Sequence, residues 1–305
     1  MITWLAPGVF CSSNDDGSIA VWSSASRTWM DLQQSTTLQY DPAWGVANSA
    51  DSLATGSKLF LVAGHANGFV SLWSGNLDGT GLKLLRGVDV RNPNPTNPWG
   101  LHNIRGVSVI LWTNTNGYIV TGSEDGYLCV LQLPDGAILS QTVYNLGAQR
   151  GINSVAAFGQ NLLVSNCSVG PNDNNLWYYW IDGSKWSVTL KDGTNLRVNP
   201  EAPQVFNFCT IWGWSNNQPC FFASTEEGAL WMGRITPSQR LSVLGYETVY
   251  GNLGSALAFN ANGELVVVNY NLYEFSTQIK PSIEPSQNPE RLPLSLWPPL
   301  MENRR

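Results

Sequence analysis

The sequence predicts an all-β fold built from repeated units, and two observations lead to this prediction. Short apolar runs rich in Val, Leu, Trp and Tyr alternate with turns of Gly, Asn and Asp, and no long stretch has the helical period. One turn, in which two polar residues and a Gly open onto an apolar run, recurs along the chain. Because Gly accepts a positive φ, each copy is predicted to be a hairpin turn. The copies are "NDDGSIAVW" (14–22), "HANGFVSLW" (65–73), "SEDGYLCVL" (123–131) and "TEEGALWMG" (225–233).

Each unit is predicted to hold four strands. A first strand that ends in a large residue precedes each hairpin pair, and an outer strand such as "GLKLLRGV" or "RLSVLGYETVY" follows it. Successive first strands lie about fifty residues apart, which gives six units. Six four-stranded units without helices predict a six-bladed β-propeller. The first strands end at Trp4, Leu53, Trp112, Phe158, Trp212 and Phe259, and we expect the three Trp of this set to pack between blades.

Two regions depart from the repeat. We expect residues 1–279 to form a single propeller domain and residues 280–305 to form a Pro-rich C-terminal tail, because Pro is hard to place inside a sheet. The segment "DVRNPNPTNPWGLHNIRG" (89–106) is long and loop-like. Loops of this length are often functional, and a plain surface excursion is the alternative.

Composition and charge exclude several classes of protein. Only 12% of residues are charged and the formal net charge is −6, whereas a nucleic-acid binder would show a basic stripe. No apolar run approaches the roughly 20 residues that span a bilayer, so we expect no membrane partner. The chain is predicted to be cytoplasmic if Met1 is the native start, and secreted if a leader has been removed. The five cysteines are predicted to be buried apolar residues, with a Cys209–Cys220 disulfide as the alternative.

Two segments resemble blades of a known family. "GINSVAAFGQNLLVSN" (151–166) and "NLGSALAFNANGELVVVNYNLYEF" (252–275) are similar to blades of the gluconolactonase-like (calcium-dependent phosphotriesterase-like) six-bladed propellers. "VTGSEDGYLCVLQLPDG" (120–136) looks more like a WD-repeat blade, but the Gly-His and Trp-Asp dipeptides of that family are missing from their places. The first resemblance implies an enzyme that binds a divalent cation, often calcium, through Glu, Asn and Asp of its innermost strands.

Three asparagines match the Asn-type positions of that family. Asn48, Asn153 and Asn207 each lie five residues before a strand-ending large residue, where two other units have Val107 and Gly254. The Glu and Asp of the family pattern are absent. Because calcium takes six to eight oxygens, many of them from carboxylates, we predict no metal site, with calcium held by the three Asn as the weaker alternative. The amides would either close the channel as a hydrogen-bonded ring or orient a neutral ligand.

His102 and Arg105 are the predicted catalytic residues. Imidazole titrates near neutrality and guanidinium binds anionic oxygen, so the pair could protonate and stabilise a substrate; an ordinary polar loop is the alternative. We expect His65 at an exposed turn, and Asp51 and Asp89 as the carboxylates nearest the propeller axis. No Ser–His–Asp order indicates a triad hydrolase.

These residues predict a pocket on the propeller axis for a neutral or weakly polar small organic molecule. Asn48, Asn153 and Asn207 would bind the ligand, and Trp44 and Trp99 would form walls. An enzyme of this kind would be a metal-independent lyase, cyclase or lactone-type hydrolase. The alternatives are a lectin with Trp-lined glycan sites and a WD-repeat-like protein-interaction scaffold.

Overall fold

The fold was analysed in a computed structural model, in which the predicted C-terminal tail lies outside the described residues. The structure describes residues 1–14, 16–25, 31–94, 101–111, 117–133, 136, 138–143, 151–167, 170–202, 205, 207–214, 218–248, 254–259 and 265–269. By contact density the chain divides into two compact units, at the boundary between Ile152 and Asn153.

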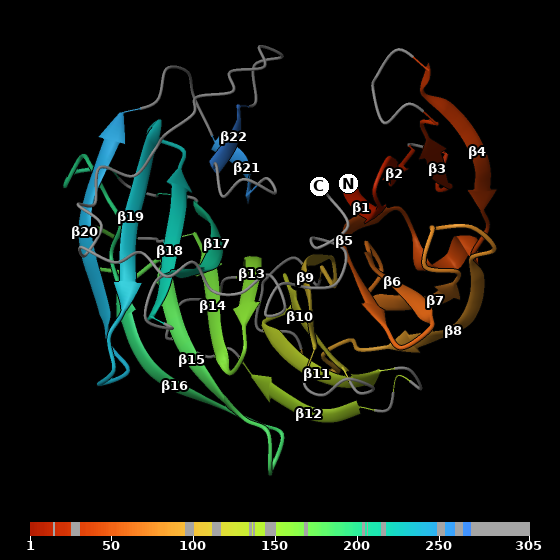
Figure 1. The fold of residues 1–305 in the computed structure, drawn as a ribbon. Coiled ribbons are helices and arrows are strands. Elements are labelled where there is room, and N and C mark those ends of the chain that lie inside the picture. The colour runs from red at the N-terminus through yellow and green to blue at the C-terminus, as the bar shows by residue number, and fades with distance from the viewer. Residues whose placement is uncertain are drawn as a thin grey trace. The chain divides into compact units, whose positions relative to one another are not determined.

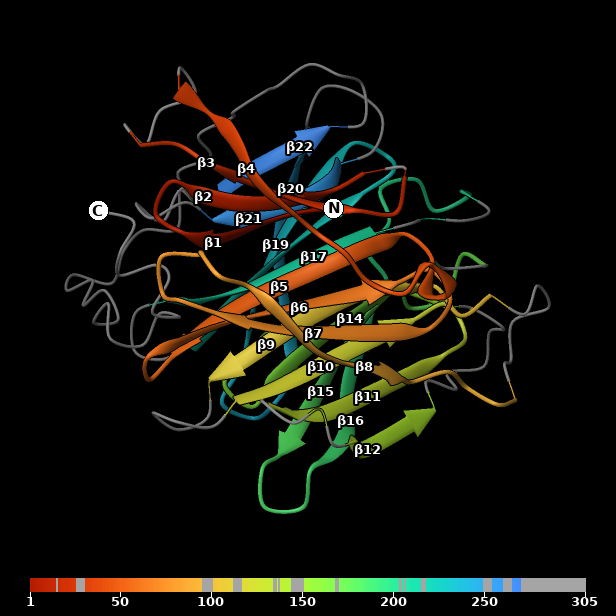
Figure 2. The ribbon, with the colours of Figure 1, turned by 90° about the vertical axis from the view of Figure 1, so that its right-hand side faces the viewer.

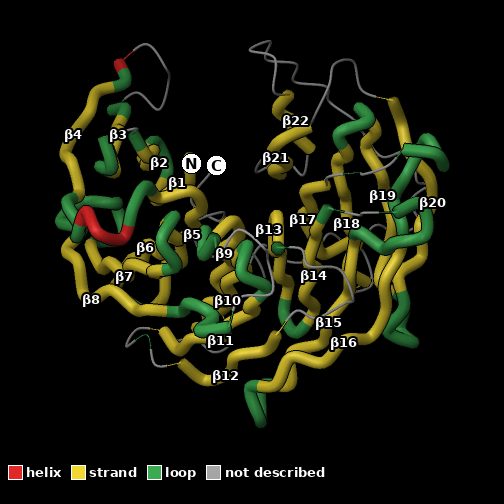
Figure 3. Tube along the Cα trace, turned by 180° about the vertical axis from the view of Figure 1, so that it is seen from behind, coloured by secondary structure: helices red, strands yellow, loops and turns green. Residues whose placement is uncertain are grey.

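The first unit holds three four-stranded antiparallel sheets. In each sheet the strands pair in chain order (Figure 1). The 3-10 helix η2 (Pro42–Trp44) precedes the second sheet and is a short helical segment among strands and loops (Figure 3). The strands are β1 (Ile2–Ala6), β2 (Val9–Ser13), β3 (Ile19–Ser23), β4 (Gln33–Leu38), β5 (Ala47–Thr55), β6 (Lys58–His65), β7 (Phe69–Gly75), β8 (Lys83–Asp89), β9 (Ile104–Leu111), β10 (Gly117–Ser123), β11 (Tyr127–Leu133) and β12 (Ile138–Val143).

The second unit repeats the pattern twice and then holds a two-stranded sheet within the described residues. Its strands are β13 (Ile152–Phe158), β14 (Asn161–Asn166), β15 (Leu176–Asp182), β16 (Ser187–Thr194), β17 (Asn207–Trp214), β18 (Gln218–Thr225), β19 (Ala229–Ile235), β20 (Leu241–Thr248), β21 (Gly254–Phe259) and β22 (Leu265–Asn269). The prediction of an all-β chain of four-stranded units is therefore confirmed for five sheets.

The cores lie between neighbouring sheets. In the first unit, Leu5 and Cys11 of the first sheet pack in one apolar cluster with Leu61 of the second. A further cluster joins the second and third sheets, and one in the second unit joins the sheets of β14 and β18. Figure 2 shows β5, β6, β7 and β8 following one another across the second sheet. Strands such as β6 and β10 are buried on both faces, which explains why they appear in the sequence as continuous apolar runs.

Side chains of the first strands also join neighbouring sheets through hydrogen bonds. Ser52 Oγ donates to the carbonyl of Trp4 at 2.5 Å, and Asp51 Oδ2 accepts from the amide of Val109 at 2.8 Å. In the second unit, Ser154 Oγ accepts from the amide of Cys209 at 3.0 Å. Asp51 thus serves to link β5 to β9, a structural role that the sequence did not indicate.

Each outer strand carries a β-bulge at an equivalent place. One residue of each outer strand has no partner in the preceding strand. It lies opposite the step that follows the fourth residue after the turn glycine, or its equivalent, in that preceding strand. The outer strands are β4, β8, β12, β16 and β20. A bulge twists an exposed edge and discourages pairing with another chain. The skipped residues are Ser35, Leu85, Leu139, Lys191 and Leu244.

Several expectations about burial can be compared with the structure. All five cysteines are buried, as predicted. Cys209 and Cys220 are free thiols, and in the register of β17 and β18 they face Ala223 and Trp212, so the alternative disulfide is wrong. Trp4 is 39% exposed, so its expected place between blades is also wrong.

Candidate functional site

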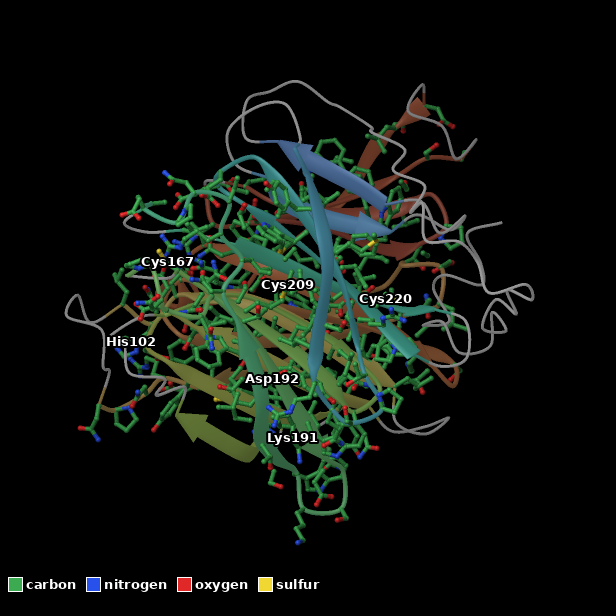
Figure 4. The ribbon with its side chains drawn as sticks, turned by 90° about the vertical axis from the view of Figure 1, so that its left-hand side faces the viewer. His102, Cys167, Lys191, Asp192, Cys209 and Cys220 are labelled. Carbon is green, nitrogen blue, oxygen red and sulfur yellow. The ribbon has the colours of Figure 1, made fainter. Side chains whose placement is uncertain are left out.

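Ion pairs concentrate in one stretch of this weakly charged chain. Within the described residues three arginine–carboxylate ion pairs and one histidine–carboxylate pair are found, and three of these four pairs lie between Asp89 and Asp125 in the first unit. The fourth joins Arg240 to Asp192 of β16 in the second unit. Asp192 is labelled in Figure 4. We call the six residues of the three pairs the paired-charge cluster: Asp89, Arg91, His102, Arg105, Glu124 and Asp125.

Asp125 is the buried centre of this cluster. Its carboxylate is fully inaccessible to solvent and is surrounded by donors. Oδ2 accepts from the Asn92 amide at 2.9 Å and lies 2.8 Å from Nδ1 of His102. Oδ1 accepts from the Tyr127 amide at 3.2 Å and from the Ser123 hydroxyl. Four donors fix the carboxylate, as a buried ionised group requires.

The position of Asp125 follows from the repeated turn. The residue before the turn glycine ties the turn to the linker that enters the same sheet. Asn67 donates to the carbonyl of Ala43 at 2.9 Å, and Glu227 accepts from the amides of Val198 and Asn199 at 2.7 and 2.8 Å. Asp125 holds Asn92 in the same way, but it alone of these three residues also binds a histidine.

His102 packs beside Arg91 on the β6–β7 turn. Gly68 has φ +80°, and a Cβ at this position would lie 2.2 Å from Cγ of Arg91 and 2.9 Å from Cβ of His102. The turn glycine therefore makes room for both side chains. The His102 side chain, labelled in Figure 4, is 26% exposed, and no described residue forms a hydrogen bond with its Nε2.

Arg105 and Asn48 occupy equivalent bulges. Arg105 is skipped between the pairs Ile104–Ser123 and Gly106–Gly122 of β9 and β10. Asn48 is skipped between the pairs Ala47–His65 and Ser49–Gly64 of β5 and β6. The equivalent of Asn48 in the third sheet is therefore Arg105, and the predicted Val107 is wrong.

The error came from counting back from Trp112. Ile110, which pairs with Tyr118, is the true counterpart of Leu53, which pairs with Phe60. Asn207 keeps the predicted spacing, but it pairs directly with Thr225 and is not in a bulge.

A polar network joins the two bulges. Asn48 Nδ2 donates to Asn103 Oδ1 at 2.5 Å, and the carbonyl of Asn103 accepts from the Glu124 amide at 2.9 Å. Glu124 in turn forms an ion pair with Arg105 at 2.7 Å. The structure thus brings together three predicted site residues, Asn48, His102 and Arg105, around the β10–β11 turn.

Trp44 stands in a stack of rings that leads to the cluster. It stacks on Tyr40 at 6.1 Å and on Phe69 at 5.8 Å between ring centroids. Arg91 lies 5.1 Å above the Phe69 ring and forms an ion pair with Asp89, which lowers the pKa of that carboxyl. Trp44 therefore packs in the row of aromatic rings that ends beside Arg91. Its expected role as a pocket wall stays a proposal.

His65 lies at the β6–β7 turn, as predicted, but its side chain is buried and not exposed. Its Nδ1 lies 3.1 Å from the carbonyl of Gly45, and its Nε2 lies 2.8 Å from Oγ of Ser71, which also accepts from Trp73 Nε1. Nδ1 donates to this carbonyl, because a carbonyl oxygen can only accept, and in the neutral ring Nε2 then accepts from the Ser71 hydroxyl. Burial lowers the pKa of His65 to about 4.

The remaining predicted residues are not part of this arrangement. Asn153 belongs to the second unit, and its buried Nδ2 has no hydrogen-bond partner among the described residues. The side chain of Asn207 and all of Trp99 lie outside the described part. In that part no three His, Cys, Asp or Glu side chains are grouped to hold a metal ion. No helix of the described chain is long and apolar enough to cross a membrane.

Comparison with known proteins decides the fold. No family profile and no curated protein matches the sequence. A crystal structure of a protein from Lactobacillus plantarum matches with a TM-score of 0.65 and 15% identity, over 89% of this chain and 77% of the other. The computationally designed protein Ika8 matches with a TM-score of 0.50 and 16% identity, over 87% of this chain and 67% of the other. The fold is β-propeller-like. At sequence identities of 15% and 16%, the two matches support the fold and nothing about the function.

The sequence did not point to the acidic partners of the cluster. Glu124 and Asp125 stand in "SEDGYLCVL", which we interpreted only as a hairpin turn. One signal was available: an acidic residue also precedes the turn glycine in "NDDG" and "TEEG". That recurrence marks the position that binds the linker in the Glu227 turn.

Proposed function

We propose that this protein binds a small, neutral, polar organic molecule at the paired-charge cluster, with His102 as the group that exchanges protons with it. The observation that carries the proposal is the gathering of two arginine–carboxylate ion pairs and the His102–Asp125 pair around a partly exposed histidine. Three carboxylates face two arginines and one histidine, so with a neutral imidazole the cluster carries one net negative charge, spread over paired groups. Such a surface offers alternating donors and acceptors to an uncharged polar ligand.

The chemistry of the cluster suits acid–base work. Because Nδ1 of His102 donates to Asp125, Nε2 is left to accept a proton from a ligand. Arg105, 47% exposed, can turn its guanidinium toward a developing negative charge. The Asn48 and Asn103 amides add hydrogen-bonding groups beside it. In its enzymatic form the protein would be a metal-independent lyase, cyclase or lactone-type hydrolase.

The finer assignments rest on the sequence. A six-bladed ring, a likeness to the gluconolactonase-like propellers and an axial position of the ligand are parts of this proposal, whereas the ligand-binding roles of Asn153, Asn207 and Trp99 stay predictions from the sequence. A lectin is the rival that uses similar chemistry. The described Trp44 is already stacked on Tyr40 and Phe69, which favours a single polar site over a Trp platform for glycans.

A ligand screen tests the proposal. Saturation-transfer NMR with monosaccharides, polyols and aldonolactones would find binders, and calorimetry would give their affinity. We expect His102→Gln and Arg105→Gln to weaken binding at least tenfold. Arg240→Gln, which removes the ion pair to Asp192 in the second unit, is the matched control and should not change it. Equal affinity in all four proteins would contradict the proposal.

A further inference from the structure

We infer that Asp125 is the positioning residue that fixes the tautomer and orientation of His102, an inference that rests on the proposed function. Asp125 would act through the imidazole without touching the ligand, since its carboxylate is fully buried. Its Oδ2, 2.8 Å from Nδ1 of His102, keeps the proton on Nδ1 and leaves Nε2 unprotonated in the neutral ring. The accessible nitrogen of His102 is then a base.

The other turns show that this contact is not needed to hold the fold. Glu227 occupies the same turn position as Asp125 and holds its linker through two amides, at Val198 and Asn199. Asn67 holds its linker through the carbonyl of Ala43. Neither binds a histidine within the described residues. The turn can therefore hold its linker without a histidine, and the hydrogen bond between Asp125 and His102 is an additional contact.

The surroundings of Asp125 make it a rigid support. Tyr127 and Asn92 donate backbone amides, and Ser123 donates its hydroxyl, so the carboxylate cannot turn away from the ring. Asn92 Nδ2 also donates to the carbonyl of Asp125 at 2.9 Å. Arg91 and His102 also pack together on Gly68 of the β6–β7 turn. The imidazole is thus held from two elements.

The chain itself suggests the variant that separates the two roles of Asp125. Asp125→Glu copies the residue that the β18–β19 turn uses at this position, so the turn and linker should still be held. The longer side chain moves the carboxylate away from its present contact with Nδ1. Glu227→Asp is the reciprocal control, because Glu227 binds the amides of Val198 and Asn199 and no histidine among the described residues. Asp125→Asn, which keeps the size and removes the charge, is the second variant if the first fails to fold.

The measurement uses the fact that the chain has two histidines. In protein labelled with 15N-histidine, long-range proton–nitrogen correlations at alkaline pH report the tautomer of each neutral ring. We expect His102 to be entirely in the Nδ1–H form in the parent and in Glu227→Asp, and to populate both forms in Asp125→Glu or Asp125→Asn.

The outcomes of the inference and of the proposed function can be told apart. A parent protein whose His102 samples both tautomers, or variants that leave the Nδ1–H form unchanged, would overturn the positioning role, whatever the ligand screen finds. A fixed tautomer that changes in the variants, together with a screen in which no compound depends on His102, would support the positioning role and refute the proposed function alone.

Discussion

Arg105 and Asn48 stand in equivalent β-bulges at the starts of two neighbouring first strands, and the Asn103–Glu124 link connects them. A bulge turns a side chain out of the regular alternation of a strand and often re-aims it at a site. The two residues are therefore presented by the fold, and neither is required by the ladder of backbone hydrogen bonds. Their substitution should affect the site more than the stability.

Arg105→Asn, which copies Asn48 into the third sheet, tests this separation. The ion pair with Glu124 is about half exposed on the Arg105 side, so its loss should change the free energy of unfolding by about 0.5 kcal/mol or less. Urea denaturation measures this quantity. A loss of several kcal/mol would mean that Arg105 serves the fold.

Gly68→Ala should damage both the fold and the cluster. The added Cβ would meet Arg91 and His102, and the backbone has φ +80°. Gly56→Ala is the matched control, because Gly56 also has a positive φ but a Cβ there meets nothing within 4 Å. We expect the control to lose about 1 kcal/mol of stability from its backbone alone. Gly68→Ala should lose at least twice as much and shift the His102 resonances, and equal losses would show that the contacts at Gly68 are not tight.

His65 should make the protein sensitive to acid. Its pKa is lowered to about 4 in the folded state, from 6.5 in the unfolded chain, so the unfolded chain binds a proton first as pH falls. The stability is complete above pH 6.5 and declines toward pH 4 by about 3 kcal/mol, since each pKa unit is worth ~1.4 kcal/mol. Urea unfolding at pH 7, 5.5 and 4.5 would show this decline. His65→Gln should remove it, and a parallel decline in the variant would assign the acid sensitivity to other groups.

Deleting Leu85 should promote association of chains. This residue is the bulge of β8, it is 49% exposed, and its removal would give the outer strand a regular edge. We expect larger species in size-exclusion chromatography than in the parent at equal concentration. Replacement by Ser keeps the bulge and should leave the elution unchanged. Identical elution of the deletion variant would show that the bulge does not protect the edge.

The repeating strands and turns could be predicted from the sequence, but the register of the first strand of the third sheet could not. Turn glycines such as Gly68 and Gly126 indicated the hairpins, because these turns need a residue with a positive φ. Trp112 misled the count because the counterpart of Leu53 in the third sheet is Ile110, and an apolar run that holds both Ile110 and Trp112 does not show which of them has that place. The sequence indicated part of the candidate site, because His102 and Arg105 lie in or next to the long loop-like segment. It did not indicate Asp125, because the contact of this residue with His102 forms only when the turn and the linker come together in the folded chain.

The most direct test of the account follows the imidazole resonances of the two histidines while neutral polar compounds are added. His65 is buried beside Ser71 and reports on the fold, whereas His102 reports on the paired-charge cluster. The account predicts that a binding compound moves the His102 signals, leaves those of His65 in place, and reaches the same shift of His102 in Arg105→Gln only at about tenfold or higher concentration. A compound that binds with measurable affinity while the His102 signals stay fixed would contradict it.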